Sequence, residues 1–146
     1  MTEQPLYECY WLYGAVDVVS GSSFFLEMSA LDGDEFTVFL AELSREYAES
    51  LNVVIIDGAG AHTSPRLAVP ENVVLVRLPP YCPDLNPVER LWRDVKAHID
   101  VTVAAHRENL VALRDHVAAR LCAYTDAQMH ALTGYRYLVE AAKALE

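Results

Sequence analysis

The chain has 146 residues, which suits a single domain, residues 1–146, with a sizeable hydrophobic core. Hydrophobic residues make up 53% and charged residues 22%, a globular composition that excludes a disordered or low-complexity chain. The net charge of −10 argues against a DNA-binding surface that acts alone, because affinity for DNA comes largely from lysine and arginine.

The first predicted elements are a β-hairpin and a helix. Residues 7–28 hold two runs rich in aromatic and β-branched residues on either side of the turn signal at 20–23, which predicts antiparallel strands. Residues 34–50 follow as a helix, with Asp32 as N-cap and Glu35 three residues later in a capping-box pattern. The apolar residues of this helix share one face: Phe36, Phe39, Leu40, Leu43 and Tyr47.

Two apolar runs without alternation predict the next elements. Residues 53–57 and 73–78 have the pattern of strands that are buried on both faces, which is typical of parallel strands in the middle of a sheet. The first run ends in Asp57. Ligands of open α/β sheets usually bind at the carboxyl ends of such strands, so Asp57 is a candidate site residue.

A proline-rich segment leads from the second strand to a helix predicted over residues 87–99. Asn86 suits the N-cap of this helix, Pro87 its first position and Glu89 its third. Further helices are predicted between residues 105 and 145. The order of hairpin, helix, two strands and helices predicts an α/β fold with a mixed sheet flanked by helices.

Asp57 and Glu89 are the residues with the clearest chemistry. An acid at a strand end and another in the first turn of a helix can meet at one point, and paired carboxylates are ligands for divalent metal ions. Each acid also has a plain structural explanation. Asp57 could serve as a turn or capping acid, and Glu89 as part of a capping box.

The two acids lie in segments that resemble the catalytic domain of insertion-sequence transposases of the mariner superfamily. These segments are Asp57–Ala59 with His62 nearby, and Leu78–Trp92, which reads LPPYCPDLNPVERLW with Cys82 at a position where serine is usual. Three further segments are similar to that family: Tyr13–Asp17, Phe36–Leu43 and Gly134–Tyr137. The family consists of DDE-type endonucleases with an RNase H-like fold, which the resemblance implies for this chain.

The resemblance assigns roles to individual residues. It implies that Asp57 and Glu89 are the second and third acids of a triad that binds two Mg²⁺ or Mn²⁺ ions, and that His62 and Asn86 are accessory residues near them. Three basic residues of the same helix as Glu89 are candidates for contacts with DNA phosphates: Arg90, Arg93 and Lys96. A solvated helix face, with Arg90 paired to Asp94, is the plainer explanation for them.

The first acid of the triad has no clear counterpart. In the family it lies on the first strand of the sheet, well before the segment that matches Tyr13–Asp17, and this chain starts a few residues before that segment. We therefore expect the first strand, its acid and the helix-turn-helix module that binds transposon ends to be missing. Asp17 is a weak substitute, because it lies beside the hairpin turn. The chain is expected to be inactive alone, as one product of a split reading frame or as a remnant.

The resemblance implies metal-dependent cleavage and transfer of DNA strands in transposition, with transposon ends and target DNA as substrates. The expected partners are a helix-turn-helix region or second reading-frame product, and a second copy of the chain. An alternative of another class is a non-catalytic module that binds a partner or DNA, with an open sheet edge available for pairing. A small-molecule phosphohydrolase with Asp57 as nucleophile is disfavoured, because such enzymes usually carry a second acid two residues later and position 59 is alanine.

The cysteines and the apolar segments indicate the compartment. Three scattered cysteines favour neither a disulfide framework nor a zinc site, and they fit a reducing cytoplasm. No signal peptide or membrane span is predicted. We therefore expect a cytoplasmic, nucleoid-associated protein without a membrane partner.

Overall fold

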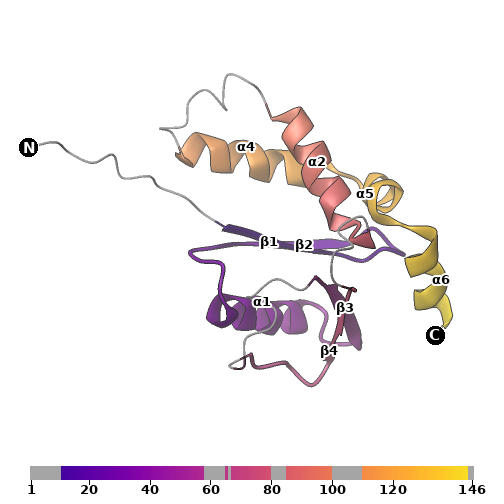
Figure 1. Cartoon of the computed structure of the whole chain (residues 1–146). Helices are drawn as coiled ribbons and strands as arrows, with labels where there is room; N and C mark the ends of the chain where they lie inside the picture. Colours follow the sequence, from indigo (N-terminus) through magenta and orange to yellow (C-terminus); the bar gives the residue numbers. More distant parts are fainter. Residues whose placement is uncertain (1–10, 58–64, 66, 80–84, 100–109, 145–146) are drawn as a thin grey trace, which may run out of the picture.

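The computed structural model describes residues 11–57, 65, 67–79, 85–99 and 110–144. In chain order, the elements of this part are β1 (Trp11–Val16), β2 (Ser23–Met28), α1 (Gly33–Glu46), β3 (Asn52–Ile56), β4 (Val73–Arg77), α2 (Val88–His98), α4 (Leu110–Ala123), α5 (Asp126–Thr133) and α6 (Arg136–Ala144). Figure 1 shows strands with helices above and below them, which confirms the predicted α/β class. No helix of the described part is long and apolar enough to cross a membrane.

The strands form two separate two-stranded sheets. β1 pairs with β2 in antiparallel register, with Trp11 opposite Met28, and β3 pairs with β4 in parallel register, with Ile56 opposite Arg77. The antiparallel and the parallel pairing that a mixed sheet contains are therefore both present, in separate pairs of strands. Among the described strands none joins the two pairs, so each of the four strands, β1 and β3 included, has one edge without a strand partner.

The turn between β1 and β2 depends on a glycine. Gly21 has a φ angle of 79°, a backbone conformation that side chains with a Cβ rarely adopt, and its N–H donates to the Asp17 carbonyl oxygen at 2.8 Å. A Cβ at this position would lie 1.9 Å from the carbonyl oxygen of Asp126 at the start of α5. The predicted turn therefore also packs directly on a helix that follows much later in the chain.

One hydrophobic core lies between α1 and the two sheets. Its buried members come from four elements: Tyr13, Phe36, Phe39, Leu40, Leu43, Ile56 and Val73. The apolar face predicted for this helix is thus the buried one, and Asp32 is the N-cap as predicted, because its Oδ1 accepts the Glu35 N–H at 2.8 Å. The helix spans Gly33–Glu46 and so ends four residues before the predicted residue 50, because Tyr47 caps it. Since α1 packs on both sheets, it holds the end of β3 in a fixed place relative to β1.

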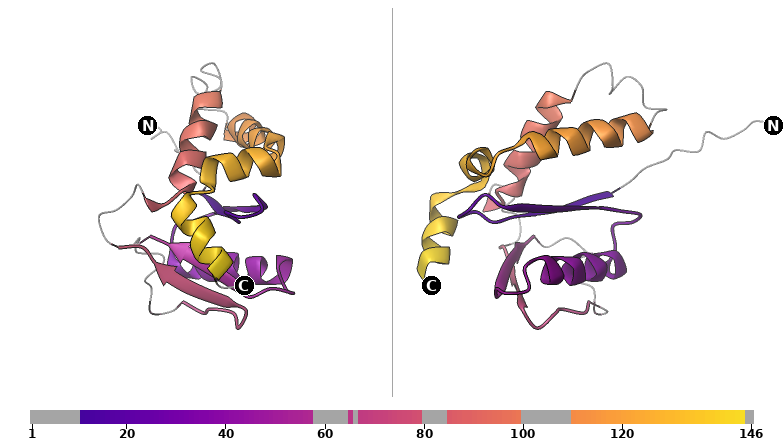
Figure 2. Two further views of the ribbon diagram at one scale, coloured as in Figure 1. Left: turned by 90° about the vertical axis from the view of Figure 1, so that its right-hand side faces the viewer. Right: turned by 180° about the vertical axis from the view of Figure 1, so that it is seen from behind.

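A second core lies on the opposite side of the hairpin. Its buried members are Leu91, Val95, Val117, Leu121 and Met129, from α2, α4 and α5. The rings of Phe25 on β2 and Trp92 on α2, whose centroids are 5.9 Å apart, connect the hairpin to α2. Figures 1 and 2 show α1 on one side of the hairpin and α2 with α4 on the other, so the hairpin is flanked by helices as predicted.

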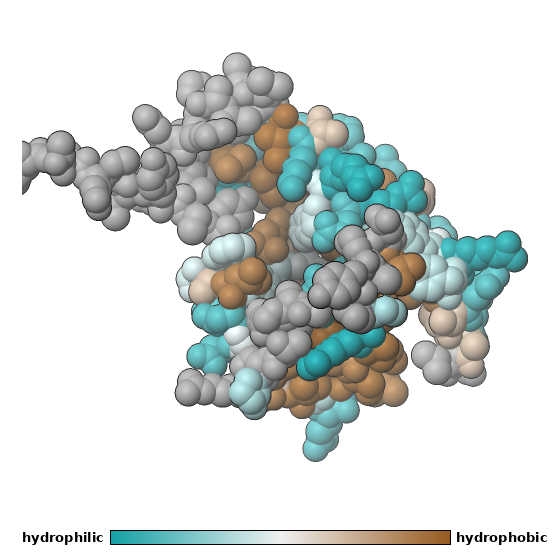
Figure 3. Space-filling model, in the orientation of Figure 1, coloured by the Kyte–Doolittle hydropathy of each residue, from teal (hydrophilic) through white to brown (hydrophobic). Residues whose placement is uncertain are grey.

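The outer face of the β3–β4 pair is open. Four side chains on it are between 37% and 45% exposed: Val53, Ile55, Val74 and Val76. The prediction that these strands are buried on both faces is therefore wrong for the described residues. The physical reason is that α1 covers only one face, where Val54 and Leu75 pack, and no described helix covers the other. Figure 3 shows the resulting apolar surface in the lower part of the molecule.

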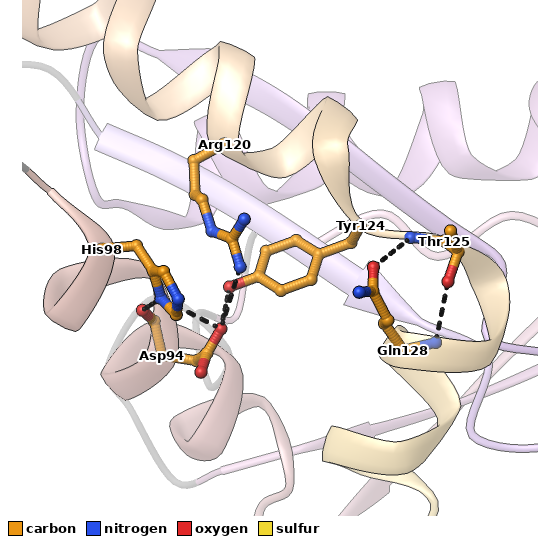
Figure 4. A network of polar contacts seen from close by, with 6 residues as sticks. All are labelled: Asp94, His98, Arg120, Tyr124, Thr125 and Gln128. Carbon is orange, nitrogen blue, oxygen red and sulfur yellow. Dashed lines mark hydrogen bonds and ion pairs between the residues drawn. The ribbon is translucent and has the colours of Figure 1, made fainter.

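A polar network fastens α4 to α2 (Figure 4). The Tyr124 hydroxyl donates to Asp94 Oδ2, and Arg120 Nη2 lies 3.5 Å from the same oxygen. The Arg120 guanidinium lies 4.3 Å from the centroid of the Tyr124 ring, and His98 Nδ1 lies 2.8 Å from the Asp94 carbonyl oxygen. The hydrogen bond from Tyr124 is the main cause that lowers the pKa of the Asp94 carboxyl, whereas burial raises the pKa of the Tyr124 hydroxyl.

The substitution Tyr124→Phe should lower the free energy of unfolding at neutral pH by about 1 kcal/mol, because it removes a hydrogen bond to a charged group. The folded-state pKa of Asp94 is below its ordinary value of 3.8, so this stabilisation is present above that pH and is lost as the pH falls through the folded-state pKa. Urea unfolding from neutral to acidic pH measures the effect. If the difference in unfolding free energy between wild type and variant stayed the same in acid, the effect would come from packing and not from the hydrogen bond.

Candidate functional site

Asp57 lies at the carboxyl end of β3, directly after Ile56, and is half-buried. The Leu78 N–H donates to the Ile56 carbonyl oxygen at 2.8 Å, which extends the β3–β4 pairing one residue beyond β4. Because the two strands are parallel, their carboxyl ends meet at one edge. Asp57 therefore lies beside the start of the connection that leads to α2.

Glu89 lies in the first turn of α2 and is exposed. The helix starts one residue later than predicted, with Pro87 rather than Asn86 at the N-cap. The reason is that the Asn86 side chain bonds only two residues ahead, where its Oδ1 accepts the Val88 N–H at 3.2 Å in a turn-like arrangement. Asn86 still supports the start of the helix, because its carbonyl oxygen accepts the Glu89 N–H at 3.2 Å.

The Glu89 carboxylate is not committed to a structural role in the described part of the chain. The N-cap of α2 has no side-chain hydrogen bond, so the capping-box explanation of Glu89 is not supported. Among the described residues its carboxylate also takes part in no hydrogen bond or ion pair. It is therefore available to a ligand.

The elements that carry the two acids are directed toward each other. Figures 1 and 2 show that the amino-terminal end of α2 is the end nearer to β3 and β4, while its carboxyl end points away. Asp57 follows β3, and Glu89 lies in the first turn of α2. The distance between the two carboxylates stays a prediction.

Two other residues singled out from the sequence are Asp17 and His62. The Asp17 carboxylate is used by the hairpin turn, because its Oδ1 accepts the N–H groups of Val19 at 2.9 Å and Ser20 at 3.3 Å. This structural role argues against Asp17 as a substitute first acid. His62 lies outside the described residues.

The basic side chains of α2 are exposed, namely Arg90, Arg93 and Lys96. Asp94 is held by Tyr124 and Arg120 from α4, which corrects the expected pairing of Arg90 with Asp94. The Arg90 guanidinium instead lies 5.6 Å from the centroid of the Tyr135 ring. Asp94 is therefore engaged by Tyr124 and Arg120 rather than by the basic side chains of its own helix face.

Two tyrosines at the start of α6 were not predicted as site residues. The Tyr137 hydroxyl donates to the carbonyl oxygen of Leu85, just before α2, and the centroids of the Tyr135 and Tyr137 rings are 6.2 Å apart. Their only sequence signal was the resemblance of Gly134–Tyr137 to the transposase family. Local spacing could not show that they contact the start of a helix about 50 residues earlier.

The described residues offer part of a metal site. No group of three or more histidine, cysteine, aspartate or glutamate side chains in the described part of the chain is placed to hold a metal ion. Asp57 and Glu89 supply oxygen donors, the ligands that Mg²⁺ and Mn²⁺ prefer. The donor chemistry of the two residues suits such an ion, and a complete site would take further ligands from outside the described residues.

The fold therefore has an aspartate directly after β3 and a glutamate in the first turn of α2, the two acids singled out from the sequence. Residues 7–111 match the family model of the DDE superfamily endonucleases. This match covers more than half of the chain, which therefore belongs to the DDE superfamily endonucleases, and the predicted resemblance is confirmed.

A curated relative is also similar. The chain is 38% identical over 84 residues to the uncharacterized protein y4pE/y4sA of Sinorhizobium fredii (strain NBRC 101917 / NGR234). The aligned region covers 57% of this chain and 62% of that relative, so the match spans less than two thirds of the relative's length. No solved structure gives a significant match.

Proposed function

We propose that this chain supplies two of the three carboxylates of a divalent-metal-dependent endonuclease that cleaves and joins DNA strands in transposition. The observation that carries the proposal is the pair of acids, Asp57 at the carboxyl end of β3 and the uncommitted Glu89 in the first turn of α2. Membership of the DDE superfamily endonucleases supports it. Such a protein would act on nucleoid DNA in the cytoplasm.

In this proposal, Asp57 and Glu89 would hold Mg²⁺ or Mn²⁺, and a third acid would complete a two-metal site. The bound ions would supply activation of the attacking hydroxyl and neutralisation of charge on the phosphate. Ile56, just before Asp57, and Leu91, two residues after Glu89, are buried in the two cores, which would hold both acids in place before substrate binds. Arg90, Arg93 and Lys96 would contact DNA phosphates beside Glu89.

The third acid would come from outside the described residues. One edge of β1 and one edge of β3 have no strand partner in the described part, although α1 packs on both sheets in one core. A strand added between them would join the two pairs into one mixed sheet and could bring an acid beside Asp57. We infer that a helix-turn-helix-bearing segment or a second reading-frame product supplies this strand.

A Mn²⁺ titration of the 146-residue chain tests the proposal. We expect weak binding, and a loss of at least about tenfold in affinity for both Asp57→Asn and Glu89→Gln, because each removes a charged ligand. Asp17→Asn is the matched control, since an asparagine can keep the hydrogen bonds of the turn. Equal affinity of wild type and the Asp57→Asn variant would place the metal elsewhere and contradict the proposal.

A second candidate function is a non-catalytic module that binds a partner chain, a second copy or DNA. The open apolar face of β3–β4 and the unpaired edges of β1 and β3 favour it, because exposed sheet edges and apolar patches are typical interaction surfaces. Under this alternative, partner binding would be independent of Mn²⁺. It would also be unchanged in the Asp57→Asn and Glu89→Gln variants.

A further inference from the structure

The start of α2 is held by a residue from the other end of the chain. The Tyr137 hydroxyl donates a hydrogen bond to the Leu85 carbonyl oxygen, across 52 residues of sequence. Leu85 precedes Asn86, whose side chain accepts the Val88 N–H at the first residue of the helix. Two hydrogen bonds, linked through the Leu85–Asn86 peptide, therefore connect α6 to the turn that carries Glu89.

A second contact acts on the same turn. The Arg90 guanidinium, next to Glu89 in sequence, lies over the Tyr135 ring, and this ring contacts that of Tyr137. Leu138, the residue after Tyr137, is buried, so α6 packs against other parts of the protein at this point. Leu85 and Arg90 lie on either side of Glu89 in sequence, so Tyr137 contacts the segment just before α2 and Tyr135 contacts α2 just after Glu89.

This support matters because a helix start is otherwise prone to fray. The N-cap of α2 has no side-chain hydrogen bond, and Glu89 is exposed. A carboxylate in such a turn would sample several positions unless the backbone before it were fixed. Burial raises the pKa of the Tyr137 hydroxyl, so it stays protonated and able to donate throughout the neutral range.

We propose that Tyr137 is a positioning residue for Glu89, which fixes the loop before α2 so that the Glu89 carboxylate points at the metal. The inference rests on the proposed function, in which Glu89 is a metal ligand. Tyr137 itself touches neither metal nor substrate. Its role is to hold the Leu85 carbonyl, and through it the first turn of α2.

The test compares Mn²⁺ affinity and stability in three tyrosine-to-phenylalanine variants of the 146-residue chain. Tyr137→Phe keeps the ring and loses the bond to Leu85, and we expect about tenfold weaker Mn²⁺ binding with native far-UV circular dichroism. Tyr124→Phe removes a hydrogen bond to a later turn of the same helix, and should lower stability while leaving Mn²⁺ affinity unchanged. Tyr135→Phe keeps the ring under Arg90 and should bind as wild type.

The outcomes separate this inference from the proposed function. If Glu89→Gln binds Mn²⁺ as wild type does, the proposed function fails. If Glu89→Gln weakens binding but Tyr137→Phe does not, only the positioning role of Tyr137 is overturned. Equal losses of Mn²⁺ affinity in Tyr137→Phe and Tyr124→Phe would also overturn it, because they would reflect general destabilisation of α2.

Discussion

The 146-residue chain is expected not to nick DNA with Mn²⁺, and a protein extended by an amino-terminal strand that carries an acid is expected to cleave it. The chemical reason is that the first acid of a two-metal site commonly ligates both ions, and without it neither the attacking nor the leaving oxygen is correctly held. The structural support is that β1 and β3 each have one edge without a strand partner among the described strands, which leaves room for the proposed strand. We expect the two proteins to differ by at least about 10³-fold in rate.

A nicking assay on supercoiled plasmid measures this difference. The extended protein with Glu89→Gln is the matched control, and it should be as inactive as the short chain. Robust cleavage by residues 1–146 that is lost in the Asp17→Asn variant would contradict the account. It would show that Asp17, and not a residue of an added strand, is the first acid.

The substitution Leu91→Ala should cost about 2–5 kcal/mol of unfolding free energy, the range for a leucine truncated in a buried core. Leu91 is 0% exposed and packs α2 against α4 and α5 in the second core. Urea unfolding gives the value, and Val111→Ala on α4, where the side chain is 64% exposed, is the control that should change little. A cost well under 1 kcal/mol for Leu91→Ala would mean that this core does not hold the helix that presents Glu89.

The elements, and the places of Asp57 and Glu89 at element ends, could be predicted because the relevant patterns are local. The spacing of Phe36, Phe39, Leu40 and Leu43 gives the buried face of α1, whatever that face contacts. The run that ends in Asp57 and the Asn86–Glu89 helix start are equally local. For the same reason, both acids could be assigned to element ends before any contact between elements was known.

Features that depend on distant partners could not be predicted. The apolar residues of β3 indicate burial on both faces, but burial depends on what covers the strand, and Val53 and Ile55 are exposed. The expected pairing of Arg90 with Asp94 followed a spacing rule within one helix. Tyr124, 30 residues after Asp94, takes that carboxylate instead.

Gly21 shows the same limit within an element that was predicted. The turn signal of residues 20–23 predicts a glycine-containing turn, and the φ angle of 79° at Gly21 is one that glycine readily adopts. The close approach of the Asp126 carbonyl oxygen could not be inferred, because it depends on where α5 lies. The contact of Tyr137 with Leu85, beside the candidate site, also could not be inferred, because it depends on where α6 lies.

The central claim is that Asp57 and Glu89 share a divalent metal ion, and a crystal structure of the chain soaked in Mn²⁺ tests it most directly. The account predicts one anomalous peak within about 2 Å of an oxygen of each residue, with the two carboxylates about 4–7 Å apart. A metal peak elsewhere, or carboxylates on opposite sides of the β3–β4 pair, would contradict it.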